Sequence, residues 1–353
     1  MNRLAAAVLS PLSGLYGVAM KARRAFYRRG WLRQESVPAP LISVGNLTMG
    51  GTGKTPLVEW IAVQLAAANR HVCILTRGYG REQPQQRVVV SNRTEILSHA
   101  RQAGDEALLL AESLQQSAAV ISDTDRRSAA LWAMKNLGSD VFVLDDGFQN
   151  LGLARNLDIV TIDATNPWGN RRLLPAGILR EPPRGLSRAN CVVITRTDEA
   201  EDLQELEREI RELSGSQPIF HSRMRIRGLR VVNASAEDVP TEIKEVPIAA
   251  FCGIGNPQSF FEQLRSAGYQ LGLTEIFRDH HVYTKADVNK LIQKAKAAGL
   301  RALLTTAKDE VKLRALTFDL PCFAVEIGIE IDKEDQFRSL IENSLKEFSK
   351  ARP

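Results

Sequence analysis

The chain has 353 residues, of which 44% are apolar and 25% are charged, and its formal net charge is +5. This composition is ordinary for a globular protein, and the length suits two α/β units or one large domain with an insertion. Residues 1–34 hold seven Lys and Arg and no acid, so removing that +7 leaves the rest of the chain at −2. No nucleic-acid partner is expected, because such a surface would spread basic residues over the folded domain. The four cysteines are widely separated, which predicts reduced core thiols.

Residues 1–33 predict a basic amphipathic helix that associates with a membrane. The uncharged stretch from Leu4 to Met20 is short for a membrane span and is interrupted by Pro11. Helical spacing separates an apolar face from a basic one. The apolar face holds Leu4, Val8, Leu12, Leu15, Ala19, Ala22 and Phe26, and the other holds Arg3, Ser10, Gly17, Lys21, Arg24 and Arg28. Such a helix can lie in an anionic membrane surface. The alternative is a helix packed on its own domain with its cations facing water.

Residues 34–217 alternate between short apolar runs and amphipathic segments, as expected for repeated β-α units. The predicted strands are 41–44, 72–76, 88–91, 119–122, 140–144, 157–163 and 191–195. The predicted helices are 55–68, 105–115, 125–135 and 202–213. Nearly continuous apolar strands are typical of a mostly parallel sheet sandwiched by helices. The fold class is therefore α/β and, with the motif described below, P-loop NTPase-like.

The pattern changes after residue 217. Residues 218–222 and 228–233 predict β segments, the first continuing through the basic run 223–227, and residues 218–245 form a short β linker. Residues 246–353 then predict a second, smaller α/β domain. Its strands are expected at 246–251, 302–305 and 323–331, and its helices at 259–267 and 284–298. A last polar helix follows, which can pack back on the first domain.

A glycine-rich loop between the first strand and the first helix of the domain predicts a nucleotide-binding site. Its expected binding residues are Thr48, Met49, Gly50, Gly51, Thr52, Gly53, Lys54 and Thr55. Glycines let backbone N–H groups turn toward phosphate oxygens, and the helix N-terminus adds its positive dipole end. Lys54 is expected on the β/γ-phosphates and the Thr55 hydroxyl on Mg²⁺. A strict G-x-x-x-x-G-K-[ST] motif requires glycine where Thr48 stands; the loop is closer to that of MinD-like and metallochaperone ATPases, although Met49 replaces their frequent lysine.

The apolar strand that ends in Asp145 and Asp146 is typical of a Walker-B segment, which places a carboxylate beside the P-loop to hold hydrated Mg²⁺. The sequence does not rank these two acids. The predicted metal ligands are Thr55, Asp145, Asp146 and Glu106, and the predicted cofactors are ATP and Mg²⁺.

Transfer to a hydroxyl group requires a base, and two segments offer one. Asp105 and Glu106 open a helix after Gly104, where acids also serve as ordinary helix-dipole partners. The second segment, Asp279-His280-His281, combines a carboxylate with imidazoles and is equally compatible with a structural role. Thr306-Ala307-Lys308-Asp309 follows a strand of the second domain, where catalytic loops often lie.

Together these motifs resemble the tetraacyldisaccharide 4′-kinase family, the lipid A pathway kinases of Gram-negative bacteria. The matching stretches in the first domain are 44–56, 76–80, 104–106, 144–149, 174–177 and 179–182. Those in the second are 251–257, 279–281 and 306–309. One departure is Asn150, where the family usually has histidine; asparagine cannot titrate near neutrality, so a proton-transfer role at this position is in doubt.

The resemblance implies that ATP phosphorylates the 4′-hydroxyl of a tetraacyldisaccharide 1-phosphate, giving the 1,4′-bisphosphorylated product. It implies catalytic roles for Lys54, for Asp105 and for a histidine of the 279–281 stretch, of which we choose His280. It also implies two α/β/α domains joined by a β linker, with peripheral or monotopic contact at the cytoplasmic face of the bacterial inner membrane. No obligate protein partner is evident.

Two rival interpretations stay open at this point. A regulatory NTPase of the MinD-like or metallochaperone class shares the loop type, but such proteins commonly carry the lysine that Met49 replaces. A soluble small-molecule kinase leaves the basic N-terminal helix without a role.

Overall fold

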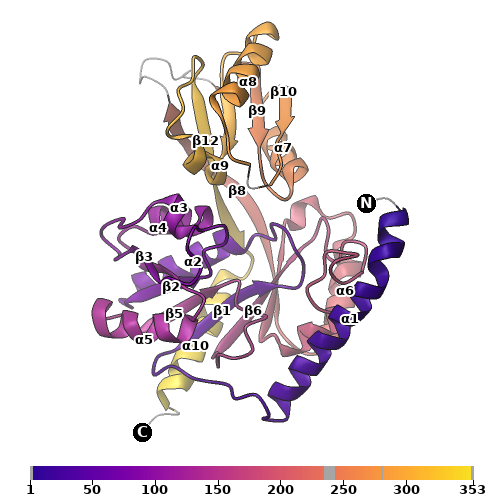
Figure 1. Cartoon of the computed structure of the whole chain (residues 1–353), viewed down its shortest axis with the longest axis vertical. Coiled ribbons are helices and arrows are strands. Elements are labelled where there is room, and N and C mark those ends of the chain that lie inside the picture. The colour runs from indigo at the N-terminus through magenta and orange to yellow at the C-terminus, as the bar shows by residue number, and fades with distance from the viewer. Residues whose placement is uncertain (1–2, 234–242, 280, 351–353) are drawn as a thin grey trace.

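The computed structural model describes the backbone of residues 3–233, 243–279 and 281–350. A large lobe contains β1–β7 with α1–α6 and α10, and a small lobe contains β9–β12 with α7–α9 (Figure 1). The predicted catalytic residue His280 and part of the predicted linker, residues 234–242, lie outside the described residues.

One mixed sheet joins the twelve strands of the described chain, in the order β10-β9-β11-β12-β8-β7-β6-β1-β5-β2-β4-β3. In the large lobe the strands are β1 (Leu41–Asn46), β2 (Val72–Thr76), β3 (Val88–Ser91), β4 (Ala118–Ser122), β5 (Val141–Asp145), β6 (Leu157–Asp163) and β7 (Cys191–Thr195). The strand β8 (Ile219–Asn233) follows, and the small lobe adds β9 (Ile248–Cys252), β10 (Leu271–Ile276), β11 (Leu303–Thr306) and β12 (Cys322–Ile331).

Helices cover both faces of the sheet in the large lobe. The α-helices of the described residues are α1 (Arg3–Arg28), α2 (Lys54–Ala67), α3 (Ala100–Ala103), α4 (Asp105–Ser113), α5 (Arg126–Leu137), α6 (Leu203–Ser214), α7 (Pro257–Ser266), α8 (Lys285–Ala297), α9 (Ala307–Leu313) and α10 (Glu334–Lys350). One core joins α2, α4 and α10 to one face of the strands, while α5 and α6 pack on the opposite face. Fully buried strands such as β1, β2 and β5 explain the continuous apolar runs. The predicted fold class is confirmed.

In the large lobe, the parallel strands bring the carboxyl ends of β1 and β5, which lead into the glycine-rich loop and the acidic pair, to the same edge of the sheet. β1 pairs in parallel with β5 on one side and with β6 on the other, with Val44 opposite Asp145 and opposite Ile159. The carboxyl end of β1, which leads into the glycine-rich loop, therefore lies beside the carboxyl end of β5. In such sheets ligands bind in the crevice outside the carboxyl ends of the strands.

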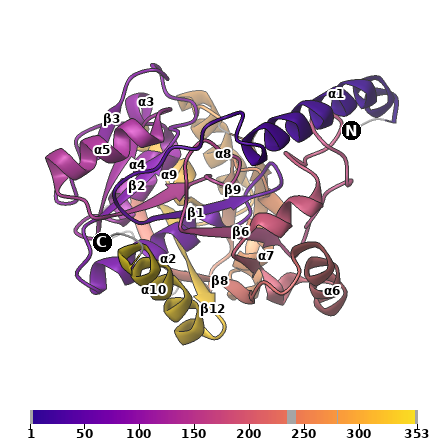
Figure 2. The ribbon, with the colours of Figure 1, turned by 90° about the horizontal axis from the view of Figure 1, so that it is seen from below.

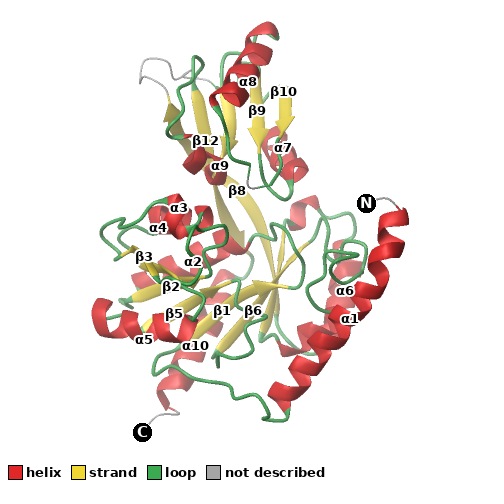
Figure 3. Cartoon of the chain, in the orientation of Figure 1, coloured by secondary structure: helices red, strands yellow, loops and turns green. Residues whose placement is uncertain are grey.

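β8 belongs to both lobes. Ile219–His221 pairs in parallel with β7, and the strand then runs antiparallel to β12 from Ser222 to Asn233. The two β segments expected at 218–222 and 228–233 are thus one strand, and the sheet passes without interruption from one lobe to the other (Figure 3).

Two elements of the small lobe differ from the sequence prediction. β10 was not predicted, because its residues alternate between half-buried and exposed positions at the edge of the sheet, without a continuous apolar run. Residues 306–309 follow a strand at a place where catalytic loops often lie, but they form no loop: Thr306 ends β11 and residues 307–309 open α9, whose first turn is capped by the Thr306 hydroxyl accepting a hydrogen bond from the Asp309 N–H.

α1 runs along the outer edge of the large lobe (Figure 2) and packs through its small residues. Ser13 Oγ donates to Leu173 O at 3.0 Å, and Gly17 lies so close to Leu173 that a Cβ there would come within 2.8 Å of its Cδ1. Helical spacing placed Gly17 on the polar face, yet it packs on the protein. Leu12, Leu15 and Val18 stay 52%, 68% and 66% exposed. None of the helices in the described part of the chain combines the length and apolar composition that a membrane crossing needs.

α10 returns from the small lobe to the large one and packs an aromatic side chain into its core. The ring of Phe337 is fully buried, 5.4 Å from that of Trp60 on α2 and 4.8 Å from that of Phe220 on β8. The contact fixes the end of the chain to the helix that follows the glycine-rich loop.

We expect Phe337→Ala to lower the free energy of unfolding by about 3–5 kcal/mol, because it removes a buried ring and leaves a cavity. The measurement is urea-induced unfolding of the full chain, with the exposed Glu347→Ala on the same helix as control. Equal midpoints for both variants would show that α10 is not part of this core.

Candidate active site

The loop between β1 and α2 has the backbone conformation that its glycines allow. Gly50 and Gly53 have φ of 108° and 74°, a region that favours glycine. A Cβ on Gly53 would also come within 2.4 Å of Met224 Cε. The loop leads directly into the N-terminus of α2, where Lys54 and Thr55 are the first residues. This is the arrangement in which backbone N–H groups and a helix dipole receive phosphate.

The ends of β6 and β7 hold the loop in place. The hydroxyl groups of Thr52 and Thr161 are 2.8 Å apart, and Thr195 Oγ1 donates to Thr52 O at 3.2 Å. Arg196 Nη1 donates to Gly51 O at 3.1 Å and also forms an ion pair with Asp163. The loop is therefore held in one conformation by residues at the ends of β6 and β7, which lie on the other side of β1 from β5.

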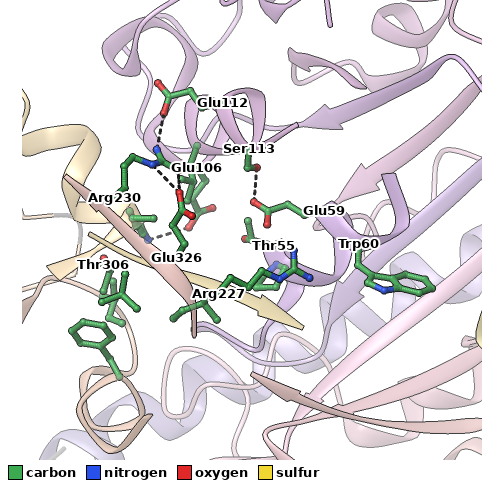
Figure 4. Close-up of a pocket in the computed structure, with 18 of the residues that line it drawn as sticks. Thr55, Glu59, Trp60, Glu106, Glu112, Ser113, Arg227, Arg230, Thr306 and Glu326 are labelled. Atoms are coloured by element: carbon green, nitrogen blue, oxygen red, sulfur yellow. Dashed lines mark hydrogen bonds and ion pairs between the residues drawn. The ribbon is translucent and has the colours of Figure 1, made fainter. Parts of the chain in front are cut away.

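Two cavities adjoin the loop. One of about 350 Å³ is lined by Thr48, Met49, Gly50, Gly51 and Thr52 and by the N-terminus of α7. The other, of about 650 Å³, lies between the lobes and extends from Thr55 along α2 past Glu59 and Trp60, with Arg230 and Glu326 on the facing strands (Figure 4). Together they offer space on both sides of the N-terminus of α2.

Asp145 ends β5 as a buried carboxyl group with an unusual environment. It accepts a hydrogen bond from Thr76 Oγ1 at 3.2 Å. Burial and the nearby carboxylates of Glu106 and Asp146 raise its pKa from 3.8 to about 6, which Lys54 offsets only in part. The site therefore holds an excess of negative charge that a cation would relieve.

Asp146, the next residue, is compensated instead by two cations. Arg180 Nη1 lies 2.6 Å from Asp146 Oδ2, and Lys54 Nζ lies 3.7 Å from its Oδ1. Burial alone would raise the pKa of Asp146, but Lys54 and Arg180 outweigh it and hold the pKa below its usual range. The two neighbouring acids, which the sequence does not rank, thus differ in charge environment.

Asp105 and Glu106 start α4 and face α9 of the small lobe. Lys308 Nζ is 3.0 Å from Glu106 Oε1, and Lys312 Nζ is 3.9 Å from Asp105 Oδ2. Because Glu106 also acts on the pKa of Asp145, the start of α4 and the end of β5 belong to one electrostatic site.

Asp279, on the small lobe, lies close to this site. Asp279 Oδ1 is 3.5 Å from Lys308 Nζ, and a Cβ on Gly255 would lie 3.5 Å both from Asp279 Oδ2 and from Gly50 Cα. His281 is occupied elsewhere: its Nε2 lies 3.2 Å from Asp287 Oδ2, and its ring stacks on that of Phe277 at 4.9 Å.

One basic residue of the site was missed by the sequence interpretation. Arg126, at the start of α5, has its pKa lowered by burial, while Asp145 acts to raise it. Its Nε is buried without a hydrogen-bond partner. The only signal was an arginine pair after a strand of the predicted sheet, which a solvated helix start explains equally well.

The chain is similar to known proteins over nearly its whole length. A family model described as tetraacyldisaccharide-1-P 4′-kinase matches residues 5–346. A tetraacyldisaccharide 4′-kinase from Desulfotalea psychrophila is 40% identical over 316 residues, which cover 89% of this chain and 90% of that protein. The same enzyme from Geobacter metallireducens is 39% identical over 313 residues, with coverage of 89% and 90%. The crystal structure of LpxK from Aquifex aeolicus in complex with ATP matches with a TM-score of 0.76 and 31% identity, covering 97% of this chain and 99% of that one.

The raised pKa of Asp145 predicts a pH-dependent effect on stability. Because the folded state binds this proton more tightly than the unfolded state, the stability it contributes is present below about pH 4 and is lost as the pH rises through about 6. In metal-free buffer at pH 8, Asp145→Asn should therefore be more stable than the wild type, by at most about 3 kcal/mol, and the difference should vanish near pH 4.

The measurement is urea unfolding with EDTA across this pH range. Asp146→Asn is the matched control with the opposite sign: its pKa is depressed in the folded state, so this variant should be less stable at pH 8. A destabilised Asp145→Asn at pH 8 would contradict the charge imbalance.

Proposed function

The chain belongs to the tetraacyldisaccharide-1-P 4′-kinase family, and we propose from this premise how its residues share the work of phosphoryl transfer. The protein is a kinase that uses ATP to phosphorylate the 4′-hydroxyl of a tetraacyldisaccharide 1-phosphate, a lipid A precursor, giving the 1,4′-bisphosphorylated product. The residue roles are supported chiefly by the convergence of Lys54, the two acids at the end of β5 and the acids at the start of α4 at one edge of the sheet.

The triphosphate binds along the glycine-rich loop, with backbone N–H groups of Gly50–Lys54 on its oxygens. Lys54, which lies 3.7 Å from Asp146, then binds the β/γ-phosphates. Arg180 stays with Asp146 and keeps that carboxylate compensated. The nucleoside extends into the 650 Å³ cavity, which opens beside Thr55 and Pro56.

The site fits Mg²⁺ because nearby cations compensate the carboxylate of Asp145 only in part. No three His, Cys, Asp or Glu side chains of the described chain are grouped closely enough to hold a metal by themselves, and Mg²⁺ in P-loop sites takes further ligands from phosphates and water. Thr55 and Asp145 would hold the ion, with Asp146 and Glu106 nearby. Bound there, Mg²⁺ supplies positive charge to the β- and γ-phosphate oxygens.

Asp105 is the general base. The 4′-oxygen of the sugar forms a bond to the γ-phosphorus as the bond from that phosphorus to the β,γ-bridging oxygen breaks, and ADP leaves with the electron pair. The hydroxyl proton passes to Asp105, whose position beside the phosphate site suits this transfer. His280 assists it: the neighbouring His281 is held by Asp287 and Phe277, which favours the first histidine of the pair.

α1 places this site at the cytoplasmic face of the bacterial inner membrane. The face of α1 that carries the small residues Ser13 and Gly17 packs on the large lobe. The apolar side chains of Leu12, Leu15 and Val18 therefore face outward together. Arg28 and Arg29 follow on the same segment and suit anionic headgroups. Contact of this kind is peripheral or monotopic.

The rival interpretation as a regulatory MinD-like or metallochaperone NTPase is not favoured. The matched family and the curated relatives are kinases, and they cover nearly all of the chain, the small lobe included.

Removing the phosphate lysine or the base should each slow transfer strongly. We expect Lys54→Ala and Asp105→Ala to lose at least about 10²-fold in kcat, the scale for losing electrostatic or acid–base assistance. The assay uses γ-labelled ATP with a detergent-dispersed lipid A disaccharide 1-phosphate. Asp335→Ala, which removes an exposed acid from the first turn of α10, is the control and should keep full activity. Normal transfer by Asp105→Ala would remove the base assignment, leaving the P-loop role intact.

The membrane role of α1 is tested with substitutions that preserve its packing. The triple variant Leu12→Ser, Leu15→Ser and Val18→Ser should lose at least about tenfold in partitioning to vesicles of anionic phospholipid, because a buried aliphatic side chain contributes about 1.5–3 kcal/mol. Leu97→Ser, at a 51% exposed position elsewhere on the large lobe, is the control. Cosedimentation in high salt is measured; equal pelleting of all three proteins would refute the assignment.

A further inference from the structure

At the interface between α4 and α9, a row of ion pairs joins acids of α4 in the large lobe to bases at the small lobe's α9. Lys308, Lys312 and Arg314 come from α9 and its C-terminal end, and Asp105, Glu106 and Glu112 come from α4. Lys308 and Lys312 are four residues apart and so share one face of the helix. Glu106 and Glu112 lie on the same wall of the interlobe cavity (Figure 4).

Lys308, at the start of α9, contacts acids of both lobes. Its side chain is 17% exposed, with Nζ 3.0 Å from Glu106 Oε1 and 3.5 Å from Asp279 Oδ1. Lys308 therefore joins the start of α4 to Asp279 of the small lobe.

The ion pairs of Lys312 and Arg314 fix the direction of α9. Lys312 Nζ is held at 3.2 Å by Asp309 Oδ1 within the small lobe and lies 3.9 Å from Asp105 Oδ2. Arg314 binds Glu112 with two guanidinium nitrogens, one of them at 2.6 Å, and also binds Glu310. A bidentate arginine pair fixes geometry as well as charge.

We propose that α9 is an electrostatic clasp between the lobes, and that Lys308 is a positioning residue which holds Asp279 at the start of α4, next to Asp105. This inference rests on the proposed kinase mechanism for its functional meaning, but the clasp itself is a property of the protein without substrate. The ion pairs are individually modest at partly exposed positions. The three bases lie on or directly after the same helix, α9. When one ion pair forms, the other two bases therefore come within range of their acids.

The reason for a charged clasp follows from the position of the site. The large cavity between the lobes has to admit a nucleotide, and a wholly apolar interface would bury the site permanently. Solvated charge pairs can separate at lower cost and re-form in one register, since each base meets its acid only in one alignment.

The test measures the distance between the lobes as well as activity. Spin labels are placed on the exposed positions Lys135→Cys of α5 and Lys290→Cys of α8, since the four native cysteines are buried. In nucleotide-free protein we expect a narrow distance distribution that broadens with Lys308→Met and stays narrow with Lys308→Arg. With Mg-ATP and the dispersed lipid, Lys308→Met should lose about tenfold or more in kcat, and Lys308→Arg should recover most of it.

Lys294→Met is the matched control, because Lys294 pairs with Glu275 inside the small lobe at 2.7 Å, and it should change neither measurement. If Lys308→Met does not fold, Arg314→Gln tests the same clasp from its exposed end and should broaden the distribution. A slower Lys308→Met with an unchanged distance distribution overturns the proposal, since the lysine then acts on the substrate. Unchanged distance and rate overturn it as well. If the wild type itself fails to phosphorylate the lipid, the proposed function falls, and the distance measurement alone decides on the clasp.

Discussion

Asp145 and Asp146 are neighbours at the carboxyl end of β5. Each side chain must either be compensated by a nearby cation or stay protonated. Asp146 meets Lys54 and Arg180, and its pKa is depressed. Asp145 has only partial compensation and a pKa of about 6. The glycine-rich loop, the Arg180 segment and the start of α4 all lie within range of this pair, and the incompletely compensated charge of Asp145 favours a cation at this edge of the sheet.

The sheet gives the two lobes a shared frame while leaving their approach adjustable. β8 pairs with β7 in the large lobe and with β12 in the small one, so hydrogen bonds cross the boundary without a break. A continuous strand ladder resists sliding but allows twist and bend. The distance between α4 and α9 is then set by side chains, and at this interface those side chains form ion pairs.

The sequence predicted well what depends on local pattern. Buried parallel strands such as β1 and β5 are continuous apolar runs, and the glycines around Lys54 stand between a strand and a helix, as a phosphate-binding loop requires. It failed where neighbours decide: β10 is an edge strand without an apolar run, and α9 is a short helix capped by Thr306. Arg126 joins the site only because α5 begins beside β5. Gly17 shows the same limit, since helical spacing separates two faces but does not say which one the protein covers.

The packing of α1 connects the helix proposed to contact the membrane with the residues at the end of β5. Tyr16 donates a hydrogen bond from its hydroxyl to Arg180 O at 2.8 Å, and the side chain of the same arginine binds Asp146. If α1 lies in the membrane surface, as proposed, it therefore fixes the height of the arginine that compensates Asp146. An acceptor with four acyl chains is costly to extract, because each buried CH₂ contributes about 0.8 kcal/mol. The enzyme avoids this cost if its site is held at headgroup level, where the sugar hydroxyl can reach Asp105 while the chains stay in the bilayer.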